Sequence, residues 1–190
     1  MKLERILPFA RQLLKKAVTP GDVVVDATLG NGHDTLFLAQ IVGENGRVYG
    51  FDIQREAVES THERLITHEL ADRVTLFQQG HETLMNAIPP VHHGKIMGAI
   101  FNLGYLPGGD KDIVTRPKTT ISAIEQLLEM MGPEGILVLV IYHGHHEGAV
   151  ERDYIIRYVE KLDQNYVHVL RYQFMNQQNN PPFIIALEKR

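Results

Sequence analysis

The sequence of 190 residues contains no cysteine. Disulfide bonds, thiolate nucleophiles and thiolate metal sites are therefore excluded, and a reducing compartment is the expected environment. The chain also has no apolar run that approaches the ~20 residues of a membrane-spanning helix. Its first residues, Met1–Arg5, do not lead into the apolar core of a signal peptide. We therefore expect a cytoplasmic protein that does not enter a membrane.

An excess of positive charge is likewise lacking, because the formal net charge is −4 at pH 7. A protein that coats nucleic acid without specificity is therefore not expected. Residues 1–20 are an exception, since they carry five basic residues and a single acidic one. Three interpretations stay open: this segment binds RNA, packs against a second copy of the chain in a homodimer, or is the solvated face of a helix.

Strand and helix patterns alternate along the chain. Short runs rich in Val and Ile predict strands buried on both faces, and apolar residues at helical spacing predict helices between them. The expected strands are 23–27, 47–52, 73–78, 96–101, 136–142, 166–174 and 182–188. The expected helices are 2–17, one after Gly32 that ends near 42, 54–68, 81–88, 119–131 and 147–163, with a loop at 102–118 and a turn at 132–135.

This alternation predicts an α/β fold with a seven-stranded, mostly parallel sheet. The last two strands have no helix between them, so we expect them to pair as an antiparallel hairpin at one edge. The length fits a single domain, with an N-terminal helix in residues 1–20 and the core in residues 21–190.

The loop after the first strand reads Asp26-Ala27-Thr28-Leu29-Gly30-Asn31-Gly32-His33-Asp34-Thr35. Ligands of such sheets bind beyond the carboxyl ends of the strands, and glycine lets the backbone approach a ligand closely. The second strand ends at Asp52, whose carboxylate can accept both hydroxyls of a ribose. Two glycines alone also fit a plain turn, and Asp52 also fits a helix N-cap. The joint spacing favours a cofactor that contains a nucleoside.

Charges in this loop discriminate between two such cofactors. The NAD fingerprint requires a third glycine where Thr35 stands. A pyrophosphate at the start of the following helix would be repelled by Asp34 and Asp26. The same carboxylates suit the ammonium and sulfonium charges of S-adenosylmethionine. The loop therefore favours S-adenosylmethionine over NAD.

Five segments together carry a resemblance to a known family. They are Val25–Thr35, Gly80-His81-Glu82, Asn102–Lys111, Tyr142–His145 and Asn180-Pro181-Pro182. The first resembles motif I of class I methyltransferases, with Asp-x-Thr-x-Gly-x-Gly in place of Asp-x-Gly-x-Gly-x-Gly. It is similar to the corresponding loop of a bacterial 16S rRNA cytosine N4-methyltransferase.

Nearly end to end, the chain resembles the family known as "putative rRNA methylase". Its members are tRNA methyltransferases that convert 5-aminomethyl-2-thiouridine at the wobble position into 5-methylaminomethyl-2-thiouridine. The resemblance implies a single-domain, Rossmann-like class I methyltransferase sandwich. It also implies S-adenosylmethionine as cofactor and the anticodon loop of a tRNA as partner.

The resemblance assigns cofactor roles position by position. The residues expected at the cofactor are Asp26, Thr28, Gly30, Asn31, Gly32, Asp34 and Thr35 at its methionine end, Asp52, Ile53 and Gln54 at the ribose and adenine, and His81 and Glu82 at the adenine edge. Glu82 equally fits a charge in the first turn of a helix.

Asn102-Leu103-Gly104-Tyr105 follows the fourth strand, where methyltransferases place their acceptor-facing loop. It matches only the ends of the Asn/Asp-Pro-Pro-aromatic tetrad of enzymes that methylate amino groups of bases. The side-chain oxygen of Asn102 can accept the hydrogens of an amine and so aim its lone pair at the methyl group. Tyr105 can stack on the base. The alternative is a loop whose glycines serve packing, with Tyr105 as a hydrophobic plug.

Three histidines and one glutamate lie within residues 143–147. A metal site is disfavoured, because methyl transfer to an amine needs none and the imidazoles would have to converge from a strand end and a loop. An alkyl ammonium has a pKa of about 10 and must first lose a proton. We expect His143 or His145 to take that proton, unless it passes directly to water.

The remaining expected contacts are to RNA. Phosphate contacts would position the substrate, while a stacked base would give specificity. The residues expected to contact RNA are Lys2, Arg5, Arg11, Lys15, Lys111, Arg116, Lys118 and the segment 176–180, with Leu103, Gly104 and Tyr142 near the acceptor base.

Four other functions compete with this prediction. An rRNA cytosine N4-methyltransferase is disfavoured by the absence of an insertion domain, and a small-molecule amine methyltransferase by the absence of a long lid insertion. Thr35 argues against a nicotinamide-dependent oxidoreductase. A noncatalytic nucleotide-binding module would not need the Asn102–Lys111 segment.

Overall fold

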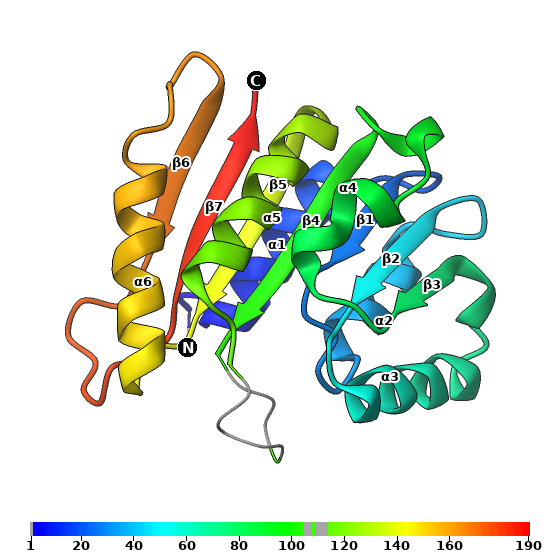
Figure 1. Cartoon of the computed structure of the whole chain (residues 1–190), viewed down its shortest axis with the longest axis horizontal. Coiled ribbons are helices and arrows are strands. Elements are labelled where there is room, and N and C mark those ends of the chain that lie inside the picture. The colour runs from blue at the N-terminus through cyan, green and yellow to red at the C-terminus, as the bar shows by residue number, and fades with distance from the viewer. Residues whose placement is uncertain (1, 105–107, 109–113) are drawn as a thin grey trace.

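The computed structural model describes residues 2–104, 108 and 114–190. This part of the chain forms an α/β sandwich around a seven-stranded sheet (Figure 1). The strands are β1 (Val23–Asp26), β2 (Arg47–Phe51), β3 (Val74–Phe77), β4 (Ile96–Leu103), β5 (Met131–Ile141), β6 (Val167–Tyr172) and β7 (Phe183–Lys189). The α-helices are α1 (Ile6–Ala17), α2 (His33–Ile41), α3 (Arg55–Thr67), α4 (Leu84–Ala87), α5 (Pro117–Met130) and α6 (His146–Val159), and the short 3-10 helices are η1 (Ala71–Arg73), η2 (His81–Thr83) and η3 (Pro90–His92).

The strand order is β3-β2-β1-β4-β5-β7-β6. Strands β1 to β5 pair in parallel, whereas β7 pairs antiparallel with both β5 and β6. The predicted mostly parallel sheet with a C-terminal antiparallel hairpin is thus confirmed. Strand β1 lies between β2 and β4, so the direction of winding reverses there and opens a crevice at its carboxyl end.

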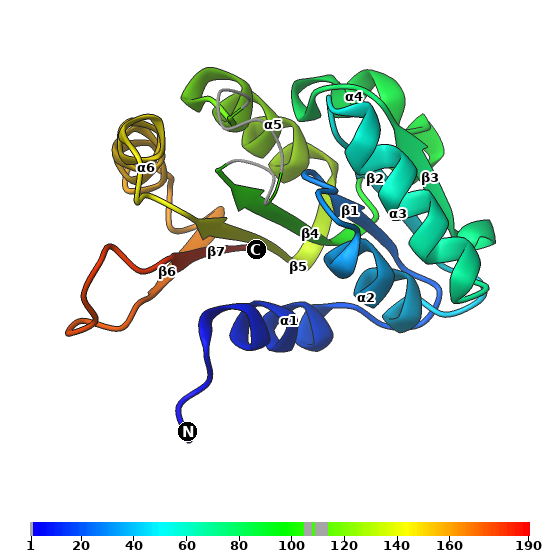
Figure 2. The ribbon, with the colours of Figure 1, turned by 90° about the horizontal axis from the view of Figure 1, so that it is seen from below.

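Helices cover both faces of the sheet (Figure 2). Successive side chains of a strand point to opposite faces, so Val24 packs with α1, α2 and α3, whereas Val25 packs with α4, α5 and α6. Each residue of β1 is buried. This double burial explains why the strand reads as a continuous apolar run ending in an acid.

Helix α1 begins at Ile6, four residues after the predicted start. Pro8 accounts for the difference, because a proline is tolerated in the first turn but would clash with the carbonyl of Glu4 if the helix began at Lys2. That carbonyl instead accepts a hydrogen bond of 2.8 Å from the Tyr172 hydroxyl. The end of β6 thereby holds the chain that leads into α1.

Two predicted connections are partly regular structure. Strand β4 runs to Leu103, which places Asn102 on a strand rather than in a loop. Residues 132–135 are a bulge within β5 rather than a turn before it, because Met131 already pairs with Ile96 and the next pair is Gly98 with Ile136. Glu134 has a φ of 65° there. The sequence pattern of a turn is the same as that of a wide bulge.

Three of the predicted helices also differ from the structure in their bounds. Helix α5 begins at Pro117, two residues early, because proline suits the first position of a helix. Helix α6 ends at Val159 instead of residue 163. The predicted helix 81–88 is divided into η2 and α4.

Candidate active site

Two cavities open at the carboxyl ends of β1, β2 and β4. The first has a volume of about 230 Å³ and the second about 580 Å³. They share part of their walls, which is made by Thr28, Gly30, Asn102 and Gly104. The two cavities are therefore adjacent at the carboxyl end of β1 and β4.

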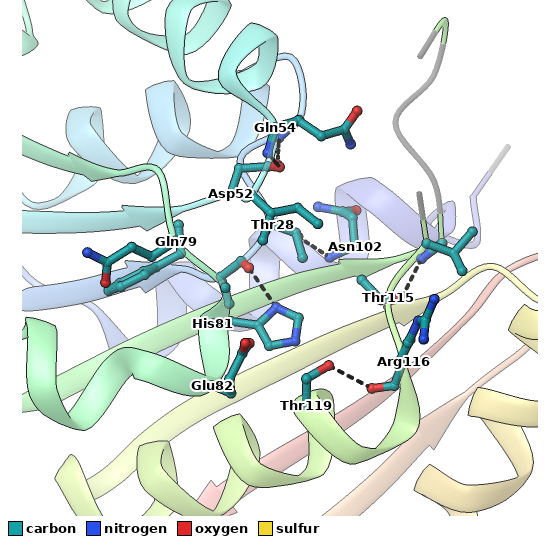
Figure 3. A pocket seen from close by; sticks show the side chains of 17 residues that line it. Thr28, Asp52, Gln54, Gln79, His81, Glu82, Asn102, Thr115, Arg116 and Thr119 are labelled. Carbon is teal, nitrogen blue, oxygen red and sulfur yellow. Dashed lines mark hydrogen bonds between the residues drawn. The ribbon is translucent and has the colours of Figure 1, made fainter. Parts of the chain in front are cut away.

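Asp52 lies in the wall of the first cavity (Figure 3). Its Oδ2 accepts a hydrogen bond of 3.1 Å from the backbone N–H of Gly30, and its Oδ1 accepts one of 3.0 Å from that of Gln54. The N-cap of α3 is Gln54, so Asp52 is not the helix cap that it could have been. Each carboxylate oxygen retains a second lone pair. Asp52 can therefore still accept two hydroxyl groups.

His81 and Glu82 close the first cavity on the side of η2. His81 is buried, its Nδ1 donates to the Ala27 carbonyl at 3.1 Å, and its ring meets Phe101 edge-on. Burial lowers the pKa of His81, so the ring is neutral. Its Nε2 has no hydrogen-bond partner within the described part of the chain. Glu82 both lines the cavity and lies in the first turn of η2, which agrees with either prediction for it.

Asp26 and Thr35 lie behind the wall rather than on it, since both are fully buried. The Thr35 hydroxyl donates to Asp26 at 2.6 Å, and the Thr28 N–H donates at 3.1 Å. Burial raises the pKa of Asp26 to about 8, with a further contribution from the nearby charge of Asp34. Asp26 is thus mostly protonated at neutral pH and supports the loop from beneath. Its part in the charge argument against a pyrophosphate does not hold, and Asp34, which lines the second cavity, is paired with Arg11.

The two loop glycines serve different purposes. Gly30 has a φ of 52° and lines both cavities. Gly32 has a φ of 74°, and a Cβ on it would lie 2.8 Å from the hydroxyl oxygen and 2.9 Å from the Cα of Thr61 in α3. Gly32 is therefore required by the close packing of α2 on α3. The carbonyl of Asn31 between them accepts a hydrogen bond of 2.8 Å from Arg64.

Asn102 lies in the shared wall and is fixed at both its backbone and its side chain. Its N–H donates to the Thr28 hydroxyl at 2.7 Å, and its Nδ2 donates to Oδ2 of Asp34 at 2.9 Å. The other oxygen of Asp34 accepts two bonds from Arg11 of α1, from Nε at 3.0 Å and from Nη2 at 2.8 Å. This arrangement commits the amide nitrogen of Asn102 and leaves its Oδ1 to accept a donor.

Residues 48–188 match the family model described as "Putative rRNA methylase". The chain belongs to this family.

Relatives and solved structures agree with that assignment. A protein of Arabidopsis thaliana, "tRNA (mnm(5)s(2)U34)-methyltransferase, chloroplastic", is 32% identical over 188 residues, which cover 95% of this chain and 68% of the relative. A crystal structure of a "putative rRNA-methylase" from Clostridium thermocellum is 42% identical, with a TM-score of 0.96 over 100% of both chains. A "putative methyltransferase" from Streptococcus mutans, in complex with SAH, is 35% identical, with a TM-score of 0.89 over 99% of both chains.

The protein is thus an S-adenosylmethionine-dependent RNA methyltransferase with a Rossmann-like fold. The residues of the first cavity fit this cofactor. Asp52 presents a carboxylate at the end of β2, next to apolar surface from Phe51 and Ile53, and Gly30 brings its backbone to the same wall. A ribose with two hydroxyls and a flat base require this combination of groups.

The second cavity of this methyltransferase contains the predicted histidines. The Nε2 of His143 donates to the Pro181 carbonyl at 3.0 Å, and its Nδ1 accepts from Arg152 at 3.2 Å. Burial lowers the pKa of His143. Both ring nitrogens are occupied, so the geometry does not support His143 as a proton acceptor. His145 lies in the same cavity wall.

The other predicted residues divide into three groups. Arg116 lines the first cavity, and Tyr142 and Asn180 line the second. Leu103 is buried in the core, and Lys118 is exposed on the first turn of α5. Tyr105 and Lys111 lie outside the described residues.

Several lining residues escaped the sequence prediction. They are Gln79, Thr115 and Thr119 in the first cavity and Leu7 and His33 in the second. His33 lies inside the Val25–Thr35 motif and Gln79 directly precedes Gly80-His81-Glu82, so their place in the sequence was the one available signal. The other three come from separate elements that only the fold brings together.

Within the described residues there is no group of three or more His, Asp or Glu side chains arranged to bind a metal ion. None of the helices in that part of the chain combines the length and apolar character needed to span a bilayer.

Proposed function

We propose that this RNA methyltransferase methylates the amine of 5-aminomethyl-2-thiouridine at wobble position 34 of tRNA, giving 5-methylaminomethyl-2-thiouridine. The observation that carries the proposal is the fixed amide of Asn102 in the wall between the two cavities. The name of the Arabidopsis thaliana relative supports the choice of nucleoside.

The amide selects an acceptor with hydrogens to donate. Because Nδ2 of Asn102 is held by Asp34, the side chain presents an oxygen to the cavity. An amine that donates a hydrogen to this oxygen has its lone pair oriented, which is the geometry that transfer requires. A ring carbon could not use this group, since it has no polar hydrogen to donate.

The cofactor would be held by the first cavity. Asp52 would accept the ribose hydroxyls, and Ile53, Gln54, His81 and Glu82 would surround the adenine. When bound, S-adenosylmethionine supplies a methyl group on a positively charged sulfur. Gly30 and Thr28, in the shared wall, would lie where the methyl group faces the acceptor.

The acceptor amine must reach the site without its proton. An alkyl ammonium has a pKa of about 10, so the protonated form dominates at neutral pH. His145 in the wall of the second cavity, or water, would take the proton. Burial and the nearby charge of Asp34 raise the pKa of Tyr142 in the same wall, so this phenol stays neutral and can donate a hydrogen bond.

An RNA substrate would be positioned by exposed basic side chains on two elements. Lys2, Arg5 and Lys15 are exposed on or before α1, and Arg116 and Lys118 are exposed at the start of α5. Both elements border the cavities. Arg11 does not belong to this set, because its guanidinium is committed to Asp34. A wobble base lies in a single-stranded loop, so presenting it requires little unstacking.

The test is transfer of labelled methyl groups from S-adenosylmethionine to bulk tRNA from cells that lack the gene. Digestion to nucleosides and mass analysis should place the label in 5-methylaminomethyl-2-thiouridine. Lys161→Ala, an exposed change beyond α6, serves as the control variant and should label tRNA as the wild type does. Label in rRNA cytosine, or in no RNA while the cofactor still binds, would show that the nucleoside has been assigned wrongly.

A further inference from the structure

A buried carboxylate lies behind the active site without lining it. Glu151 of α6 is 1% exposed, and burial raises its pKa, which the hydroxyls of Thr115 and Thr120 partly offset. The buried face of α6 is otherwise formed by Gly148, Ile155 and Val159. An apolar side chain would complete this face equally well, so the acid at position 151 requires another explanation.

Both oxygens of Glu151 accept hydrogen bonds from threonine hydroxyls. Its Oε2 accepts from Thr115 at 2.5 Å, and its Oε1 accepts from Thr120 at 2.6 Å. Because the hydrogen of the Thr115 hydroxyl points to the carboxylate, the lone pairs of that oxygen are left for a donor. The backbone N–H of Gly104 is this donor, at 3.0 Å. Thr115 also donates its own N–H to the Gly104 carbonyl at 3.1 Å.

These bonds form a chain from α6 to the wall between the cavities. Gly104 lines both cavities and follows Asn102 by two residues, while Thr115 and the adjacent Arg116 line the first. In Figure 3, Thr115, Arg116 and Thr119 lie across the cavity from Asp52 and Gln54. Gly104 has a φ of 153° and little room, since a Cβ on it would lie 3.3 Å from that of Tyr142.

We propose that Thr115 is a positioning residue for methyl transfer: its hydroxyl, which Glu151 orients, holds Gly104, and with it Asn102, in place. The effect on methyl transfer rests on the proposed function, whereas the hydrogen-bond chain itself does not depend on it. Thr120 has a different part, because its hydroxyl binds the same carboxylate, while its own link to the cavity wall is a backbone bond to Arg116 that valine would keep. The two threonines therefore form a matched pair.

The experiment compares Thr115→Val with Thr120→Val, since changes at Glu151 itself are liable to impair folding. Each variant removes one hydroxyl from the same carboxylate. Thr115→Val should lower kcat for tRNA about tenfold or more, as expected for a displaced reacting group, while the Kd for S-adenosylmethionine changes less than about threefold. Thr120→Val should keep kcat within about threefold of the wild type, and Thr115→Ser should restore it.

Hydrogen exchange of the Gly104 amide is measured on the same proteins. It should become faster in Thr115→Val and stay slow in Thr120→Val. Equal losses of kcat in both valine variants, or a Gly104 amide that exchanges alike in both, would overturn the positioning role. If the wild type methylates no tRNA while the two exchange rates still differ, the proposed nucleoside fails and the hydrogen-bond chain stands.

Discussion

The two cavities of the site draw on different lengths of the chain. The first, proposed for the cofactor (the cofactor cavity), is lined by residues from the range 27–119. The second, proposed for the acceptor (the acceptor cavity), is lined by residues from the range 7–180. Bonds between distant residues hold both, since His81 and Ala27 are 54 residues apart at the cofactor cavity and Asn102 and Asp34 are 68 residues apart at the acceptor cavity. The central part of the chain thus makes the cofactor cavity, whereas segments near both ends contribute to the acceptor cavity.

This difference indicates which segments of the chain could change to accept another substrate. The segments that line the cofactor cavity can be retained intact, since all of them lie within residues 27–119. The acceptor cavity depends on α1, α6 and the segment before β7. Substitutions in those elements can therefore alter the acceptor without disturbing the cofactor.

The largest expected effect separates the two cavities directly. Asn102→Ala should lower kcat about 100-fold, because it removes the group that orients the amine, and should leave the Kd for S-adenosylmethionine within about threefold. Asp52→Ala should instead raise that Kd strongly. Methyl transfer to tRNA and isothermal titration with the cofactor measure the two quantities. The comparison fails if Asn102→Ala weakens cofactor binding as much as Asp52→Ala does.

The next effect is on stability and lies in the cofactor loop. Gly32→Ala should lower the free energy of unfolding by about 2–3 kcal/mol, because a left-handed φ is unfavourable for alanine and the new Cβ would contact Thr61. Urea unfolding measures the change. Gly21→Ala is the control, since Gly21 also has a positive φ but has nothing within 4 Å of its Cβ position. Equal losses in both variants would mean that contact with Thr61 has no energetic weight.

A smaller effect concerns the link between α1 and the acceptor. Arg11→Met should lower kcat about tenfold, because Asp34 loses its partner and no longer holds the amide of Asn102 in one orientation. Lys16→Met, at an exposed position of the same helix, should leave kcat unchanged. If Arg11 contacted RNA instead, Arg11→Met would raise KM for tRNA and make it less dependent on salt, while kcat stayed constant. Steady-state kinetics at two salt concentrations distinguish these outcomes.

The last effect is a dependence of stability on pH. The pKa of Asp26 is raised by burial from 3.8 to about 8, so the folded state binds a proton that the unfolded state has released. The stability from this group is complete below pH 3.8 and is lost as pH rises toward 8, at about 1 kcal/mol per pH unit between them. Asp26→Asn, which imitates the neutral acid, should therefore lose less stability than the wild type between pH 6 and 7.5. Urea unfolding measures both proteins at these pH values. An equal loss of unfolding free energy in the two would refute the raised pKa.

Much of the fold could be predicted from the sequence, since buried strands, helices and the final hairpin each follow from a local pattern. The start of α1 was missed because apolar spacing was weighed without the clash that Pro8 would cause. The bulge at 132–135 was missed because glycine and proline favour a turn and a bulge alike. In both places the local sequence is compatible with two structures, and only one of them was considered.

The cofactor cavity was also largely predictable, because the order Gly30 to Asp52 is a property of the chain itself. The protonation and the hydrogen bonding of the side chains around the site could not be predicted. The sequence shows that residue 26 is an aspartate, but not that it is protonated. Its complete burial raises its pKa, and this is known only from the structure. His143 fits a general base by residue type, and only Pro181 and Arg152 show that its nitrogens are occupied.

The acceptor cavity contains residues from both ends of the chain, with Leu7 and Arg11 on one side and Asn180 on the other. During synthesis the chain emerges from its N-terminus, and distant contacts form only after both partners are present. A nascent chain that has emerged only as far as α6 already has every strand that borders the cofactor cavity, but it lacks Asn180 and β7. We therefore expect acceptor binding to be acquired after the cofactor cavity has formed.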